Sequence, residues 1–180
     1  MVPKGRFRQR IIDEADNVAR LYLEGKRLGQ PATREQKEII EGILAADYEG
    51  RTLAELLQNG HDAHDPGRTD EMLEFWLRED EGEHGVLYVA NAGEPLKDED
   101  FTALCRIAMS PKRPDQGIGN KGVGFKSVLQ LARAPEIYSA ADARGGQFDG
   151  YCFRFARPED YAVLAERVAP GQAGVSDLDV

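Results

Sequence analysis

The chain has 180 residues, 41% of them hydrophobic, which is enough for one compact domain with a buried core and too little for two ordinary domains. Its formal net charge of −9 argues against sequence-independent binding to nucleic acid, because such binding depends on a basic surface. The sequence contains neither a membrane-length apolar segment nor a secretory signal core, so we expect a cytoplasmic protein with no membrane span.

Two helices are predicted in the N-terminal region. Apolar residues recur every three or four positions over residues 8–24, which is typical of an amphipathic helix, and Gly25 is expected to help end it. Thr33 followed by Gln36 resembles a capping box that opens a second helix, continuing to Leu44. The basic residues at the start are interpreted as a solvated tail or loop: Lys4, Arg6, Arg8 and Arg10.

A third helix is predicted after Gly50. Thr52 is expected to cap it, Glu55 stands at its third helical position, and the turn-forming residues 64–67 end it. Its apolar face is supplied by Leu53, Leu56 and Leu57.

Strands and shorter helices are predicted over the rest of the chain. Residues 72–77 and 86–90 have strand character and are expected to form an antiparallel pair. The remaining elements are a helix over 98–109, a mobile loop over 110–120, a helix over 124–132 and strands over 136–139 and 150–155. This order lacks the regular alternation of a doubly wound fold, so we expect an α+β fold with helices layered on one face of a sheet.

Three segments carry residues suited to nucleotide chemistry, and the first is the third helix. Glu55, Asn59 and Asp62 lie on one face of it, where a carboxylate can activate water and a carboxamide can supply an oxygen to Mg²⁺. Polar residues at this spacing are, on their own, more often a solvated helix face.

The second segment is the end of the strand at 86–90. Asn91 can accept a hydrogen bond from an adenine amino group, and Gly93 lets a base approach the backbone. An ordinary turn is the alternative interpretation.

The third segment is residues 117–127, with four glycines in eight residues directly before a predicted helix. Backbone amides in such a loop, together with the helix N-terminus, favour a phosphate chain, and a purely structural turn is the alternative.

Other site classes are disfavoured. The glycine-rich segment has no strand just before it, as a dinucleotide fold requires, and its lysine is out of step with a P-loop. Only three histidines occur, too few for a dedicated metal centre at His61 or His64. Cys105 and Cys152 stand among apolar residues and are expected to be buried free thiols.

Taken in chain order, these motifs resemble the signature of GHKL ATP-binding domains over about residues 51–139. Residues 53–63 look like the family's N-box, residues 91–93 occupy the place of its adenine box, and residues 119–127 look like its glycine box. Residues 103–110 and 134–139 are further similar to the nucleotide domains of the sacsin and NO VEIN-like group.

The resemblance implies the Bergerat fold, a two-layer sandwich of helices on a mixed, largely antiparallel sheet over residues 49–180, with residues 1–48 as a helical extension packed on it. It implies ATP and Mg²⁺ as cofactors, Glu55 as the general base and Asn59 as the metal ligand. The nucleotide contacts implied are Asn59, Asp62, Asn91, Gly93, Gly119, Lys121, Gly122, Val123, Gly124 and Phe125. The family usually has aspartate where this chain has Asn91, so the charge that would strengthen the adenine contact is lost.

The expected function is slow, Mg²⁺-dependent ATP hydrolysis that switches a larger chaperone-like or regulatory machine. Downstream domains or a partner chain would complete that machine, and a nucleotide-dependent dimer is one form it can take. The alternative is a nucleotide-binding regulatory module without turnover. A protein-histidine kinase is less favoured, because no separate phosphoacceptor helix with a histidine is visible.

Overall fold

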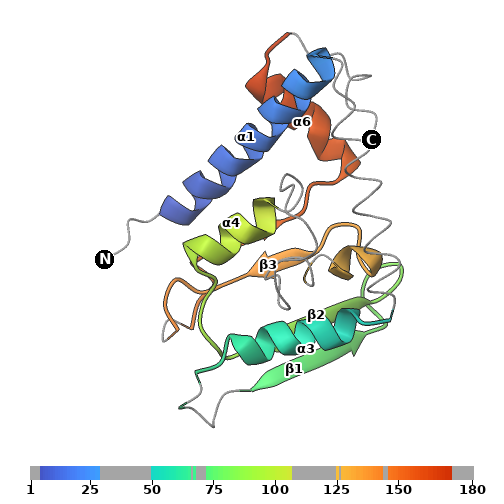
Figure 1. The fold of residues 1–180 in the computed structure, drawn as a ribbon. Helices are drawn as coiled ribbons and strands as arrows, with labels where there is room; N and C mark the ends of the chain where they lie inside the picture. The colour runs from blue at the N-terminus through green and yellow to red at the C-terminus, as the bar shows by residue number, and fades with distance from the viewer. Residues whose placement is uncertain are drawn as a thin grey trace, which may run out of the picture.

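Figure 1 shows the computed structural model of the chain, which describes residues 5–28, 50–65, 67, 72–106, 125, 127–143 and 146–171. Helices and short antiparallel strands are combined in it, which confirms the α+β class. The predicted helix over 33–44 and the predicted loop over 110–120 lie outside the described residues. None of the helices in the described ranges has the length and apolar character needed to cross a membrane.

The first helix, α1, spans Arg6–Arg27. The prediction that Gly25 would help end it is wrong, because Leu28 N donates to Glu24 O at 3.1 Å and the helical turn therefore continues past the glycine. A glycine inside a helix costs only about 1 kcal/mol, which packing of the apolar stripe readily offsets.

Helix α6, Pro158–Val168, was not predicted from the sequence. Its start is nevertheless signalled by a proline in the first turn followed by acidic residues. The Asp160 carboxylate accepts a hydrogen bond from the backbone N of Arg157 at 2.8 Å, which satisfies one of the amides at the helix start.

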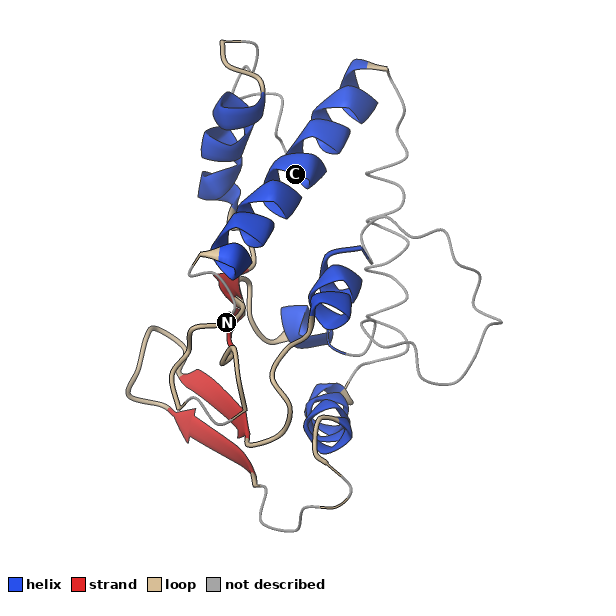
Figure 2. Cartoon of the chain, turned by 90° about the vertical axis from the view of Figure 1, so that its left-hand side faces the viewer, coloured by secondary structure: helices blue, strands red, loops and turns tan. Residues whose placement is uncertain are grey.

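Helices α1 and α6 cross and lie against each other at one end of the molecule (Figures 1 and 2). The Arg167 Nε donates to the Asp16 carboxylate at 2.6 Å, and this contact joins residues 151 positions apart in the sequence. The N-terminal helix is thus held by the last described helix.

A helix and a hairpin form the opposite end of the molecule. Strands β1, Leu73–Arg78, and β2, Val86–Asn91, pair antiparallel with Trp76 opposite Tyr88, which confirms the predicted strand pair. Helix α3, Thr52–Asp62, lies across one face of this hairpin (Figure 1).

Gly60 explains how closely α3 approaches β1. A Cβ atom at this position would lie 2.6 Å from Cδ1 of Leu73, a distance that real Cβ contacts do not show. The glycine therefore lets the helix settle directly on the Leu73 side chain.

The remaining elements lie between these two ends. They are α4 (Asp98–Arg106), a 3-10 helix η1 (Ser127–Gln130), β3 (Glu136–Tyr138) and β4 (Cys152–Arg154). Of the helix predicted over 124–132, the residues that the structure describes form mainly this 3-10 turn. Within the described residues, β1–β2 and β3–β4 are two separate two-stranded sheets, smaller than the single sheet that was expected.

An aromatic cluster forms the centre of the core. Tyr151 is fully buried and stacks on Phe101 with ring centroids 4.4 Å apart, while Phe7 of α1 and Phe153 of β4 make edge contacts with this pair. Helices α1 and α4 and strand β4 therefore meet at one point. Both cysteines are free thiols, and each is half-buried, not fully buried as predicted.

Candidate functional site

The candidate site is built on the exposed flank of α3. Two carboxylates, Glu55 and Asp62, lie on this flank. The Glu55 side chain is the better shielded of the two, with 18% exposed against 54% for Asp62. Asn59 is exposed and stands between them on the same face. The helix therefore presents a sheltered carboxylate and an accessible carboxamide one turn apart.

The Glu55 carboxylate forms a long ion pair with Arg51, the N-cap residue of α3. Arg51 Nη2 lies 3.8 Å from Glu55 Oε1, which is too long for a hydrogen bond. The carboxylate therefore keeps capacity to accept a hydrogen bond from a water molecule.

The buried side of α3 differs from the prediction in two respects. Of its three leucines only Leu56 is buried, whereas Leu53 and Leu57 are 53% and 54% exposed. The prediction that Thr52 caps the helix is wrong, since the N-cap is Arg51 and makes no side-chain cap hydrogen bond.

The Thr52 hydroxyl has another role, because it reaches the end of the glycine-rich segment. Its Oγ1 donates to the carbonyl of Ser127 at 3.2 Å, and both residues are buried, with 4% and 0% exposure. The first turn of α3 is thereby tied to the residue that closes the predicted glycine box.

Most of the predicted glycine box belongs to the part of the chain that the structure does not describe. Gly119, Lys121, Gly122, Val123 and Gly124 lie outside the described residues. Phe125 is half-buried, with its ring 6.4 Å from that of Phe155.

The other end of α3 meets the end of strand β2. Glu94 N donates to the carbonyl of Ala63, the C-cap of α3, at 2.7 Å. A Cβ on Gly93 would lie 2.4 Å from that same carbonyl oxygen, so only glycine allows this approach. The glycine that was predicted to make room for a base makes room for the end of α3.

Asn91 forms the turn at this point. Its Oδ1 accepts a hydrogen bond from Gly93 N at 3.1 Å, as in an Asx-turn. The ordinary turn that was the alternative interpretation is therefore present. An amide oxygen has two lone pairs, so one acceptor position remains after this bond.

The two motif ends are separated by the length of α3. The helix has 11 residues, so the Ser127 contact and the Gly93 contact lie ~16 Å apart along its axis. Glu55 belongs to the turn nearest Ser127, and Asp62 to the turn nearest Gly93.

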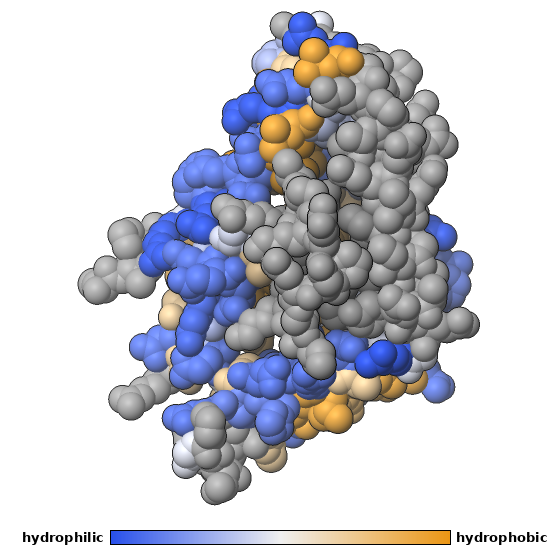
Figure 3. Space-filling view, in the orientation of Figure 1, coloured by the Kyte–Doolittle hydropathy of each residue, from blue (hydrophilic) through white to orange (hydrophobic). Residues whose placement is uncertain are grey.

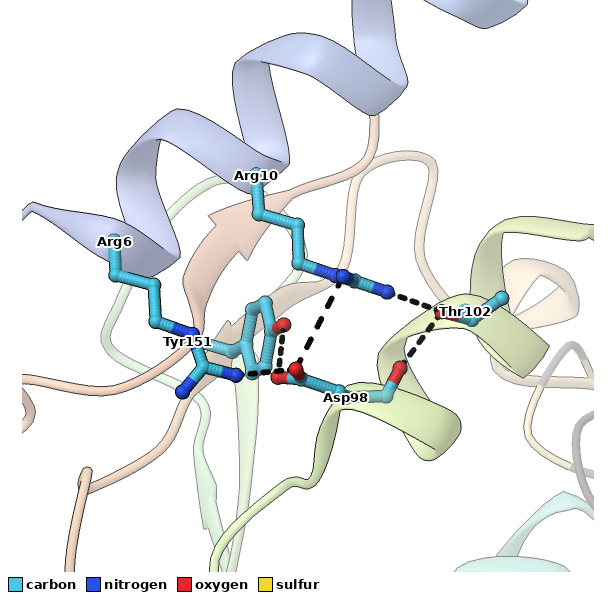
Figure 4. Close-up of polar contacts among 5 residues, drawn as sticks. All are labelled: Arg6, Arg10, Asp98, Thr102 and Tyr151. Atoms are coloured by element: carbon cyan, nitrogen blue, oxygen red, sulfur yellow. Dashed lines mark hydrogen bonds and ion pairs between the residues drawn. The ribbon is translucent and has the colours of Figure 1, made fainter. Parts of the chain in front are cut away.

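Sequence reasoning missed a polar cluster that joins α1 to α4 (Figure 4). Asp98 accepts a hydrogen bond from the Tyr151 hydroxyl at 2.7 Å and forms an ion pair with Arg6, while Arg10 donates to Thr102 Oγ1 at 2.8 Å. Arg6 and Arg10 are therefore part of a packed helix and not of a solvated tail. Their four-residue spacing was the available signal.

This cluster shifts two pKa values in opposite directions. Burial, and then the hydrogen bond to Asp98, raises the pKa of Tyr151 to about 12. The Tyr151 hydroxyl, and then Arg6 and Arg10, lower the pKa of Asp98 from its ordinary value. The charged carboxylate and the neutral phenol are thus the favoured forms.

The described residues contain no grouping of three or more histidine, cysteine, aspartate or glutamate side chains suited to a metal. His61 lies on the exposed surface of α3, with its Nδ1 3.6 Å from the Asp62 carboxylate. His64 follows the helix, and its Nε2 is buried without a hydrogen-bond partner.

Comparison with known proteins gives one local similarity. No family model matches the chain, and no solved structure matches it. Protein NO VEIN of Arabidopsis thaliana is 35% identical to it over 104 residues, or 57% of the chain. The chain spans only 3% of the length of that curated relative. It is therefore similar to one segment of a much larger protein.

Proposed function

We propose that the chain binds ATP with Mg²⁺ in a Bergerat-type site along α3 and hydrolyses it slowly, so that the nucleotide state switches a larger assembly. One observation carries the proposal. The end of the glycine-rich segment and the end of β2 contact opposite ends of the helix that bears Glu55, Asn59 and Asp62.

The order of side chains along α3 fits a nucleotide lying beside it. Phosphates held by the glycine-rich segment would lie near the first turn of the helix, where Glu55 can orient and deprotonate the attacking water. Asn59, one turn further on, can supply an oxygen to Mg²⁺, which prefers oxygen ligands. The base would then lie towards Asn91, at the far end of the helix.

Two further points support the same function. The shielding of Glu55 places a carboxylate where water can be ordered, and its distant contact with Arg51 leaves it able to accept a proton. The local similarity to Protein NO VEIN agrees with the group to which the motif order points.

A nucleotide-binding regulatory module is the second candidate. It is favoured by the bond from Gly93 N to Asn91 Oδ1, which occupies one acceptor position of a side chain that already lacks the usual charge. Such a module would bind nucleotide without turnover.

Steady-state phosphate release from the chain and from Glu55→Gln separates the two candidates. The ATPase proposal predicts turnover that falls by roughly 10²- to 10⁴-fold in the variant, with ATP binding retained. Glutamine keeps the size of the side chain but cannot accept the proton. Equal turnover in both proteins would remove Glu55 from the reaction, and ATP binding without turnover in either would favour the regulatory module.

A further inference from the structure

The outer edge of β1 has no strand partner among the described residues. Within the described residues β1 pairs only with β2, and Figures 1 and 2 show no described element beyond its other side. Natural proteins protect such edges with proline, lysine or a bulge, and the β1 sequence LEFWLR contains neither proline nor lysine. The backbone groups on this edge have no strand partner in the described part of the chain, and another strand can pair with them.

Large apolar side chains surround this edge. Trp76 is 52% exposed and Leu77 is 61% exposed, on opposite faces of the strand. Figure 3 shows apolar atoms along the lower border of the molecule, over α3 and β1. On α3 the exposed apolar side chains include Leu53 and Leu57. An exposed patch of this kind indicates a surface that another protein covers.

The patch is separate from the proposed ATP site. With 3.6 residues per turn, Leu53 and Leu57 fall on one flank of the buried face of α3, and Glu55 and Asn59 fall on the other. A partner on the leucine flank would leave the site flank open.

The sequence of β1 is complementary to itself in one antiparallel register. When the strand is paired with a second copy about Trp76, each Glu74 stands opposite Arg78 and each Phe75 stands opposite Leu77. The two tryptophans stand opposite each other. Opposite charges and aromatic pairs in such positions stabilise a sheet, whereas like charges destabilise it.

Both charged side chains can take part in this pairing. Glu74 forms no ion pair with any of the described residues. The Nε and Nη2 atoms of Arg78 donate hydrogen bonds to the Asp80 carboxylate, and Nη2 also lies 3.5 Å from Glu81 Oε1. The Nη1 atom of Arg78 takes part in none of these contacts. A guanidinium has five N–H donors, and those on Nη1 can reach a carboxylate across the edge.

We propose that β1 is a homodimerisation edge, at which two copies of the chain pair antiparallel about Trp76 to form a four-stranded sheet. The two-fold axis passes through the Trp76 pair, forms the Glu74–Arg78 and Phe75–Leu77 pairs twice each, and keeps both α3 helices on one face of the joined sheet. The self-complementary charges favour a second copy over an unrelated strand. This dimer rests on the edge alone and does not require nucleotide.

Sedimentation velocity of Glu74→Arg and Arg78→Glu, alone and mixed, tests the proposal. Each variant alone places like charges opposite each other, so its dimer should be weakened about tenfold or more relative to the unmodified chain. In an equimolar mixture each arginine faces a glutamate again, and the heterodimer should form with near-normal affinity. Recovery in the mixture also shows that both variants are folded.

Trp76 provides a second readout, because it is the only tryptophan in the chain. Its emission should shift on dilution of the unmodified chain as the dimer separates. Glu83→Arg, which makes the same charge change in the β1–β2 turn, serves as the control and should leave the dimer unchanged. The proposal is overturned by a monomeric unmodified chain at every concentration, by a mixture no better than its components, or by open-ended aggregates.

Discussion

At the scale of single residues, glycine and asparagine shape the corner where β2 meets α3. Asn91 folds its side chain back onto Gly93 N, and Gly93 approaches Ala63 more closely than any other residue could. The same two residues would lie next to the base in the proposed site. The Ala63 carbonyl fills the space beside Gly93, so in the proposed site the contact with the base would fall to the remaining acceptor position of Asn91 Oδ1.

Gly93→Ala should lower the free energy of unfolding by about 1–3 kcal/mol, because the new methyl group meets the fixed backbone of Ala63. Gly25→Ala provides a matched control, since a Cβ there meets nothing within 4 Å and the site is helical. That substitution should raise stability by about 0.5–1 kcal/mol. Urea unfolding of both variants measures the difference, and a neutral Gly93→Ala would show that the corner is not tightly packed.

At the scale of elements, α1 is held at two places. Arg6 and Arg10 bind α4 through Asp98 and Thr102, and Asp16 binds Arg167 of α6. The Tyr151 hydroxyl completes the first of these places from beside β4. We therefore expect α1 to unfold together with the rest of the described structure.

The shifted pKa values predict how this docking depends on pH. The pKa of Tyr151 is raised from 10.0 to about 12, so its contribution is complete below pH 10 and is lost as the pH rises towards 12. The pKa of Asp98 is lowered, so its contribution is present above pH 3.8 and is lost as the pH falls further.

Urea unfolding of the chain and of Tyr151→Phe across this pH range tests the prediction. The difference in stability between the two proteins should shrink between pH 10 and 12, because only the unmodified chain loses the phenol-to-Asp98 hydrogen bond there. Parallel pH profiles would mean that Tyr151 does not titrate with folding.

Elements whose sequence signals lie within a few neighbouring residues could be predicted. The strand pair β1–β2 follows from two short apolar runs around a turn, and it was found within one residue at each end. The predicted end of α1 was wrong because a single glycine costs a helix only about 1 kcal/mol and the helical bonding continues past it. The predicted cap of α3 was wrong because the Thr52 hydroxyl binds the distant Ser127 carbonyl instead. Helix α6 was missed although its first turn carries proline and two acidic residues.

At the scale of the whole molecule, the sequence predicts candidate site residues but not how distant segments meet. The bond from Thr52 to Ser127 joins positions 75 residues apart, and no local pattern indicates it. The side chains of α3 could be assigned to one face, because helical spacing alone determines that. The exposed leucines of the same helix could not be told from core residues, since burial depends on what packs against them.

Calorimetric titration of the full chain with ATP, with Mg²⁺ and then with a chelator, tests the central claim most directly. We predict saturable binding of one ATP per chain that is tighter with Mg²⁺, and an Asn59→Ala variant that loses the Mg²⁺-dependent part while keeping the rest, because the metal loses an oxygen ligand. The absence of saturable ATP binding by the folded, unmodified chain, with or without Mg²⁺, would contradict the account.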